Sequence, residues 1–337
     1  MVPLIGITMG DPAGIGPEVA LAAAVKKPPK CRLVVLGDLG VLRDTAERLA
    51  LPLKPIAWEP DLPYPRSART LPVIELSRLE PPQRQPGHPT AMGGEASYRY
   101  VETAVRFAQR EVLQGIVTAP ISKAMWHAAK RDYPGHTELL ATLTHTPEVR
   151  MMLVGKRLRV ILVTTHLALS RVPASLSSER ILRTIQMTVE HLRRFHGIAQ
   201  PRLAVAGLNP HAGEAGAFGD EEELIVAPAV QQAQAQGFTT AGPFPADTIF
   251  VRATRGEFDG VICLYHDQGL IPLKLLSWED GVNITVGLPI VRTSPDHGTA
   301  FDIAGQGKAN PRSMRAALKL AVQMTQDRSI HEPSHLS

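Results

Sequence analysis

Three histidines, His166, His211 and His266, each follow a short apolar run of strand-like composition. They are 45 and 55 residues apart (211 minus 166 and 266 minus 211), too far for a local zinc finger but natural for loops that converge at one sheet edge. Three imidazoles with an open coordination position are typical of a catalytic metal site, where the ion polarises a substrate oxygen. Each histidine alone also fits a loop or capping residue, but the repetition favours a metal site.

A second set of polar residues consists of Lys274, Asn283 and Arg292. The first two lie within the otherwise apolar stretch from Ile271 to Val291, and Arg292 follows it directly. A cation inside apolar sequence is usually paired or meets a charged ligand. A phosphate and a carboxylate both qualify as that ligand. The pattern therefore indicates an anionic substrate.

Two further loops have both a structural and a functional interpretation. The glycine-rich turn from Met9 to Glu18 fits a tight turn with a capped helix start, and equally a set of backbone N–H groups that face an anion. It does not match the dinucleotide fingerprint Gly-x-Gly-x-x-Gly. The segment from Tyr133 to Glu138 resembles a helix start, with Thr137 as the cap and His136 at its exposed end.

The elements that must position these residues alternate along the chain. Apolar runs at 32–36, 115–118, 159–163, 203–206 and 261–264 predict buried strands, and helical periodicity marks 91–113, 178–194, 221–236 and 313–326. Such alternation predicts an α/β sheet with both faces covered by helices. The proline-rich segment 51–89 is interpreted as a surface excursion around one strand at 71–76.

Composition excludes several classes of protein. The 337 residues are 44% hydrophobic, enough for a two-lobed enzyme with a substantial core. The net charge of +4 comes from dispersed Lys and Arg residues, so neither nucleic acid nor a membrane surface is expected as a partner. Cys31 and Cys263 lie in apolar runs and indicate no disulfide framework. No signal peptide or membrane span is found, so we expect a cytoplasmic protein.

Several motifs taken together resemble the 4-hydroxythreonine-4-phosphate dehydrogenase family. They follow one another from about residue 4 to residue 325, and are Gly10–Glu18, Pro134–Glu138, Thr164–His166, Leu208–Glu214, Tyr265–Gly269 and Gly281–Thr285. The run from His297 to Pro311 is similar to the adenosine-side NAD loop of isopropylmalate and isocitrate dehydrogenases. The resemblance implies a two-lobed α/β/α sandwich of the isopropylmalate dehydrogenase type, with the active site in the interlobe cleft. The expected lobes are an NAD-binding lobe, 1–125 plus 260–337, and a metal and dimerisation lobe, 126–259.

The resemblance also assigns roles to residues. It implies that His166, His211 and His266 bind a divalent metal, commonly zinc, with magnesium or cobalt as alternatives. It places His136, Thr137, Lys274, Asn283 and Arg292 on the substrate. It implies NAD, or NADP, on the loop residues His297, Gly298, Thr299, Asp302, Gly305 and Asn310. Asp247 matches a family position that would orient substrate or relay a proton, and it fits a helix cap equally well.

The implied reaction takes hydride from C3 of 4-phosphohydroxy-L-threonine to NAD, and the β-keto acid then loses carbon dioxide to give 3-amino-2-oxopropyl phosphate, in pyridoxal phosphate biosynthesis. The resemblance also implies a homodimer with an active site shared between subunits. The segment Thr118–Lys123 departs from the form seen in part of the vitamin branch. Other motifs resemble the sister branch that acts on 4-phospho-D-threonate or 4-phospho-D-erythronate. A non-catalytic metal- and anion-binding relative is the competing class.

Overall fold

The computed structural model describes residues 2–28 and 30–331, which form two compact units. Among these residues, the first unit extends to Glu148 and includes Leu288–Gln326, and the second consists of Val149–Gly287 and the described residues from Asp327 onwards. The expected lobe boundaries, at 125/126 and 259/260, lie elsewhere in the chain. The assignment of NAD to one lobe and metal to the other stays a prediction. No helix in the described residues is long and apolar enough to cross a bilayer.

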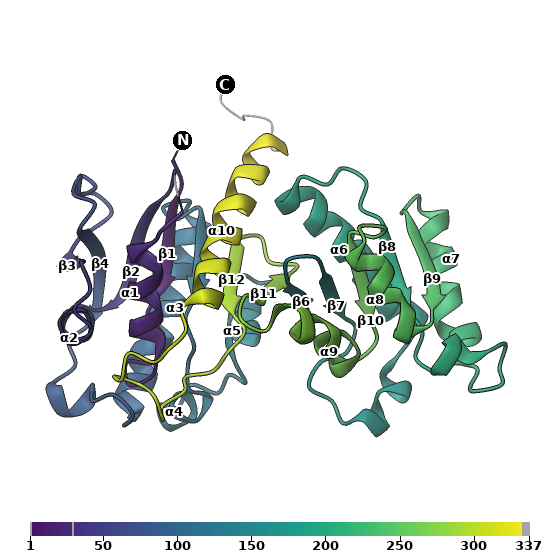
Figure 1. The fold of residues 1–337 in the computed structure, drawn as a ribbon, viewed down its shortest axis with the longest axis horizontal. Helices are drawn as coiled ribbons and strands as arrows, with labels where there is room; N and C mark the ends of the chain where they lie inside the picture. Colours follow the sequence, from purple (N-terminus) through teal and green to yellow (C-terminus); the bar gives the residue numbers. More distant parts are fainter. Residues whose placement is uncertain (1, 29, 332–337) are drawn as a thin grey trace. The chain divides into compact units, whose positions relative to one another are not determined.

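The first unit is a parallel sheet with strand order β3-β4-β2-β1-β5-β12 (Figure 1). The strands are β1 (Leu4–Thr8), β2 (Arg32–Asp38), β3 (Lys54–Ala57), β4 (Thr70–Ser77), β5 (Gly115–Thr118) and β12 (Val291–Pro295). Its helices are α1 (Gly16–Val25), α2 (Leu39–Arg48), η1 (Pro81–Gln83), α3 (Ala91–Gln109), α4 (Lys123–Ala128), α5 (His136–Leu143) and the part of α10 (Arg312–His331) up to Gln326. The mixed α/β class is confirmed, and each strand predicted in this unit is present.

The chain moves across this sheet in one direction from β1 through β2 to the edge strand β3, and in the opposite direction from β3 through β4 to β5. Because crossovers between parallel strands are right-handed, this reversal places α3 on the opposite face of the sheet from α1. The carboxyl ends of β1 and β5 are adjacent, and the helices that follow β1 and precede β5 lie on opposite faces of the sheet. Crevices at such points bind ligands in open α/β sheets. The loops that follow β1 and β5 are therefore placed where a ligand of this unit is expected.

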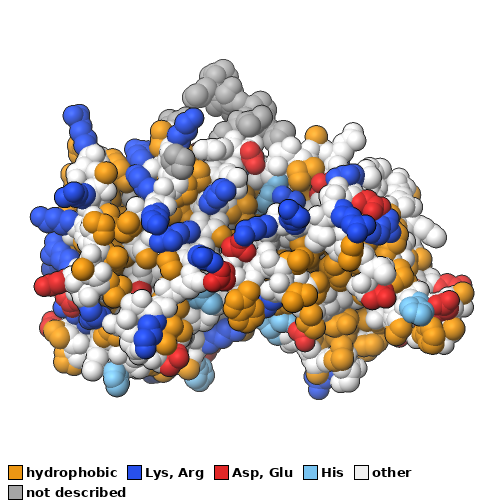
Figure 2. Space-filling model, in the orientation of Figure 1, with side chains coloured by type: hydrophobic (Ala, Val, Ile, Leu, Met, Phe, Trp, Pro, Cys, Tyr) orange, Lys and Arg blue, Asp and Glu red, His pale blue; other side chains and the backbone are white. Residues whose placement is uncertain are grey.

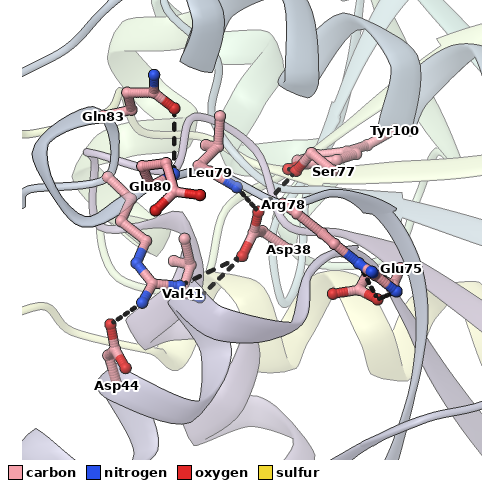
Figure 3. Close-up of polar contacts among 11 residues, drawn as sticks. Asp38, Val41, Asp44, Glu75, Ser77, Arg78, Leu79, Glu80, Gln83 and Tyr100 are labelled. Atoms are coloured by element: carbon pink, nitrogen blue, oxygen red, sulfur yellow. Dashed lines mark hydrogen bonds and ion pairs between the residues drawn. The ribbon is translucent and has the colours of Figure 1, made fainter.

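The proline-rich segment contributes more to the sheet than the sequence predicted. It supplies β4, which lies between β2 and β3, and the edge strand β3. Buried Asp38 joins this segment to β2, since its carboxylate accepts hydrogen bonds from Ser77 Oγ (2.9 Å) and Leu79 N (2.7 Å), besides capping α2 through Val41 N (3.0 Å) (Figure 3). The prediction missed β3 because only one of its residues is buried, so it carries little apolar signal.

The second unit has strand order β11-β6-β7-β10-β8-β9. β7, β10, β8 and β9 run parallel, whereas β6 is antiparallel to both β7 and β11. The strands are β6 (Arg150–Val154), β7 (Arg159–Leu162), β8 (Leu203–Ala206), β9 (Thr240–Phe244), β10 (Gly260–Cys263) and β11 (Val282–Val286). Its helices are η2 (Leu169–Arg171), η3 (Pro173–Ser175), α6 (Ser178–His196), η4 (Pro210–Gly213), η5 (Glu222–Val226), α7 (Ala227–Ala235), α8 (Ala246–Thr254) and α9 (His266–Ser277).

The sequence explains the helix α6 and the core beneath α8 and α9. Ser177 caps α6 by accepting a hydrogen bond from Arg180 N (3.1 Å), and Gly197 ends it in the left-handed conformation (φ 64°). The chain returns from β9 to β10 in the direction opposite to that from β7 to β8, so right-handed crossovers place α8 and α6 on opposite faces. Ile249 of α8 and Leu273 of α9 pack with the apolar residues of β7, β8 and β10 into one core.

Candidate active site

In the first unit, the loops after β1, β5 and β12 meet at one edge of the sheet. Gly10 has a φ of 75°, and a Cβ there would lie 2.3 Å from the carbonyl oxygen of Pro120. Asp11 Oδ1 accepts a hydrogen bond from Ala13 N (2.9 Å), and Ile15, the helix cap, makes no side-chain cap bond. The glycines of this turn thus permit close chain packing. This structural role accounts for the motif, and its anion-binding interpretation stays a prediction.

The predicted NAD loop lies against this turn. The carbonyl oxygen of Thr299 accepts a hydrogen bond from Ile15 N (2.9 Å), and the carboxylate of Glu18 accepts one from Gly305 N. Glu18 Oε2 and His297 Nε2 are buried and have no hydrogen-bond partner among the described residues. A nucleotide could supply partners for these two unpaired atoms, and the backbone of the loop lies close to the turn after β1. The residues therefore fit the NAD cofactor that the resemblance implies.

A cationic cluster forms between β5, β12 and α5 in the same unit. Arg292 is 3% exposed, and its guanidinium donates to Thr118 Oγ1 from Nη2 (2.7 Å) and from Nε (3.2 Å). Burial lowers the pKa of Arg292 to about 9, so it keeps its charge at pH 7. Burial, followed by the charges of Arg292 and Lys123, lowers the pKa of His136 well below its usual value. His136 is therefore neutral at pH 7.

The surroundings of His136 explain its place. Its ring makes an edge-to-face contact with Trp126 (5.7 Å between centroids), and Trp126 Nε1 donates to Ser97 Oγ (2.8 Å). A Cβ on Gly135 would lie 3.4 Å from Lys123 Cε, so the lysine runs along the backbone beside His136. Lys123 was not among the site residues predicted from the sequence, although it ends the segment that begins at Thr118. His136 Nε2 is buried without a partner among the described residues.

Helix α5 begins two residues earlier than the cap prediction required (137 minus 135). Its cap is Gly135, so Thr137 lies within the first turn and does not cap the helix. The cap interpretation of Thr137 was wrong because the extended backbone of Gly135 already occupies that position. The same holds for Asp247, since α8 is capped at Pro245 and Asp247 is an exposed residue of its first turn. The substrate roles of Thr137 and Asp247 stay predictions.

In the second unit, β10 lies between β7 and β8, which brings His166 and His266 together. The two rings are 5.7 Å apart between centroids. Thr164 joins the two turns, because its backbone N and its side-chain Oγ1 both donate hydrogen bonds to the carbonyl oxygen of Leu264 (3.2 and 2.7 Å). Within residues 2–28 and 30–331, no three side chains of the ligand types His, Cys, Asp and Glu gather closely enough for one ion. The structure thus pairs two of the three predicted ligands.

His211 lies in a separate loop with an unusual backbone. The six residues from His211 to Gly216 all have positive φ, at 54°, 55°, 84°, 45°, 54° and 89°. Each residue other than glycine costs roughly 1–2 kcal/mol in this conformation. Strain of this kind persists only where the surroundings over-determine it, and it clusters at functional sites. The side chain of His211 is 62% exposed, and its Nδ1 is hydrogen-bonded to Glu214 Oε2 (2.8 Å).

Buried Glu222 holds the base of this loop. Its Oε1 accepts hydrogen bonds from Leu208 N (2.6 Å) and Asn209 N (2.7 Å), and its Oε2 accepts one from Asn209 Nδ2 (2.9 Å). Gln268 ties the loop to the His266 turn, because it accepts from Leu264 N (2.7 Å) and donates to the carbonyl oxygen of Gly207 (2.6 Å). Sequence reasoning missed Glu222, whose partners are 13 and 14 residues away.

We expect the substitution Glu222→Gln to lower the free energy of unfolding by about 1–3 kcal/mol, because one carboxylate oxygen becomes a donor that faces donors. Urea denaturation measures the effect. The control is Glu223→Gln, at an exposed neighbour, which should change stability by less than about 0.5 kcal/mol. Equal stability of the two variants would contradict the role assigned to Glu222.

The remaining predicted substrate residues of this unit are Lys274 and Asn283. Lys274 is on α9, with Nζ 5.8 Å from the Trp278 ring centroid, and Asn283 is on β11. Trp278 is 79% exposed, so this cation contact lies at the surface of the unit. Their contact with a substrate stays a prediction.

The family model of the pyridoxal phosphate biosynthetic protein PdxA matches residues 29–321. The chain belongs to this family. A 4-hydroxythreonine-4-phosphate dehydrogenase of Desulforapulum autotrophicum is 48% identical over 322 residues, which cover 95% of this chain and 94% of the relative. A D-threonate 4-phosphate dehydrogenase of Cupriavidus necator is 47% identical over 337 residues, which cover 97% and 99%. Both relatives are dehydrogenases of phosphorylated hydroxy acids by name, and the chain is a member of this dehydrogenase family.

The solved structures agree. The crystal structure of 4-hydroxythreonine-4-phosphate dehydrogenase from Klebsiella pneumoniae has a TM-score of 0.87 and 42% identity, and the match covers 96% of this chain and all of that one. The fold predicted from the sequence motifs is therefore the fold of the PdxA dehydrogenases.

Proposed function

We propose that this chain is a metal-requiring, NAD-dependent dehydrogenase that oxidises 4-phosphohydroxy-L-threonine to 2-amino-3-oxo-4-phosphobutanoate, which decarboxylates to 3-amino-2-oxopropyl phosphate. The observation that carries the proposal is the cluster of the cations Arg292 and Lys123 with neutral His136, in a member of the PdxA family. A buried guanidinium anchored on Thr118 suits a phosphate or carboxylate held by charge-assisted hydrogen bonds.

The residues of the chain have distinct roles in this proposal. Arg292 and Lys123 bind and orient the anionic group, and neutral His136 offers a ring nitrogen to a substrate oxygen. His166 and His266, with a third histidine, hold the metal, and Asp247 is the proposed proton relay. When bound, a divalent cation polarises the reacting oxygen and NAD accepts hydride. The imidazole donors fit zinc, with magnesium or cobalt as alternatives, and NADP is the alternative to NAD.

We further propose that the active unit is a homodimer whose third metal ligand comes from the partner. Hydrophobic side chains gather over α8 and α9 (Figure 2), where Ile271, Leu275 and Trp278 are 66, 85 and 79% exposed. Here a groove of about 510 Å³ is lined by both helices and by Asp247 and Asp267. Contiguous apolar surface of this kind is typical of protein interfaces. A second copy of the chain is the proposed occupant.

The alternative substrate is 4-phospho-D-threonate or 4-phospho-D-erythronate. The observation that favours it is the 47% identity to the D-threonate 4-phosphate dehydrogenase, close to the 48% identity to the 4-hydroxythreonine-4-phosphate dehydrogenase. A non-catalytic relative is the third candidate.

An assay of NADH production, with Zn²⁺ present, separates these functions. We expect the highest kcat/KM with 4-phosphohydroxy-L-threonine, compared with 4-phospho-D-threonate and 4-phospho-D-erythronate. A higher value with either threonate or erythronate would transfer the assignment to the sister activity. If none of the three substrates gives NADH, the assignment as a non-catalytic binding protein would be favoured.

A further inference from the structure

Two of the three predicted metal-binding histidines carry a carboxylate on the same ring nitrogen. Nδ1 of His266 is 2.7 Å from Oδ1 of Asp267, and Nδ1 of His211 is 2.8 Å from Oε2 of Glu214. A carboxylate only accepts hydrogen bonds, so Nδ1 of each ring carries the proton. In the neutral imidazole, Nε2 then holds the lone pair. Nε2 is therefore the atom of each ring that is ready to bind a metal ion.

The two contacts arise from unrelated backbones. Asp267 follows His266 directly in the first turn of α9, whereas Glu214 reaches His211 from three residues away through the left-handed turn. Glu222 and Asn209 hold the base of that turn. The same arrangement of imidazole and carboxylate thus appears at two sites built in different ways. A shared requirement on the two rings explains this better than a coincidence of two surface ion pairs.

We propose that Asp267 and Glu214 are positioning residues for the metal, which fix the tautomer and orientation of His266 and His211 and strengthen Nε2 as a donor. The inference rests on the metal site of the proposed function. The side chains of Asp267 and Glu214 are 70% and 57% exposed. An ion pair with this exposure contributes little to the free energy of unfolding. An effect on metal affinity without an effect on folding therefore distinguishes a positioning role from a structural one.

The first measurement is the Zn²⁺ affinity of the purified protein by competition with a chromogenic chelator. We expect Asp267→Ala and Glu214→Ala each to weaken Zn²⁺ binding about 10- to 100-fold, with unchanged thermal unfolding of the metal-free protein. Asp267→Asn keeps an acceptor oxygen but loses the charge, so its affinity should lie between those of Asp267→Ala and the wild type. The matched control is Glu190→Ala, which removes an exposed carboxylate on α6 and should leave the affinity unchanged.

The second measurement needs neither metal nor activity. In metal-free protein labelled with ¹⁵N-histidine, the NMR signals of His266 should report a proton on Nδ1, and Asp267→Ala should shift the population towards Nε2–H. Retention of Zn²⁺ by His266→Ala would overturn the proposed metal site itself. If His266→Ala loses Zn²⁺ while Asp267→Ala and Glu214→Ala keep wild-type affinity and the wild-type tautomer, the metal site stands and the positioning role is wrong.

Discussion

Mixtures of inactive histidine variants should recover activity in two of three combinations. His166→Ala, His211→Ala and His266→Ala should each lose bound metal and at least about 10²-fold in kcat, because the group that polarises the reacting oxygen is lost. We expect the mixtures that contain His211→Ala to regain roughly a quarter of wild-type sites, assuming random exchange of subunits in a two-fold dimer. The mixture of His166→Ala with His266→Ala should stay inactive.

The structure provides the reason for this choice of pairs. His166 and His266 are neighbours within one unit, at 5.7 Å between ring centroids, so we expect one chain to supply both to the proposed metal site. His211 is held by Glu214 in its own loop and belongs to no group of three ligands within the described part of the chain. When the altered residues come from different chains, one heterodimer site carries both lesions and the other carries none. When they come from the same chain, every site carries one lesion.

Two controls make the mixing experiment decisive. Differently tagged chains, purified in tandem, verify that subunits exchange, and elemental analysis verifies that each variant has lost metal. If exchange occurs and all three mixtures stay inactive, each metal site is built within one chain. Recovery in the mixture of His166→Ala with His266→Ala would show that these two neighbours serve different sites.

Replacement of Arg292 should remove the preference for a phosphorylated substrate. We expect the wild type to use the phosphorylated substrate at least about tenfold better than its dephosphorylated form, and Arg292→Ala to lower kcat/KM for the phosphorylated form about 10- to 10²-fold. One charge-assisted contact contributes about 1.5–3 kcal/mol. Arg292→Lys keeps the charge but not the two-pronged geometry, so its kcat/KM should fall between those of the wild type and Arg292→Ala.

The dephosphorylated substrate is the internal control for Arg292. Because the lost contact is absent from that substrate, wild type and Arg292→Ala should turn it over at similar rates. Arg292 also donates a hydrogen bond to Thr118 Oγ1, so its replacement could lower stability. Thermal unfolding of each variant must therefore be measured together with the kinetics. Equal turnover of both substrates by the wild type would show that the substrate phosphate is not needed. An equal loss on both substrates would place Arg292 on another group, such as the substrate carboxylate.

The sequence by itself determined several of the buried strands, the long helices and the loops where chemistry is expected, but not strands such as β3, β6 and β9. Runs such as 115–118 and 203–206 are buried on both faces of a parallel sheet, so their apolar residues are continuous and easily recognised. Residues that directly follow such strands, including His166 and His266, must lie at the carboxyl edge of the sheet whatever the strand order. Burial of side chains is a local property of the pattern, and so the mixed α/β class was predictable.

Only the tertiary structure decided which of these residues meet. Strand order depends on the path of each crossover, and nothing in the local pattern of β7, β8 or β10 shows that β10 inserts between the other two and places His266 beside His166, 100 residues earlier in the chain (266 minus 166). The left-handed turn at His211 was equally hidden. Its base is held by Glu222, a contact over 13 residues that the local pattern of the sequence does not reveal, and its positive φ angles depend on such surroundings.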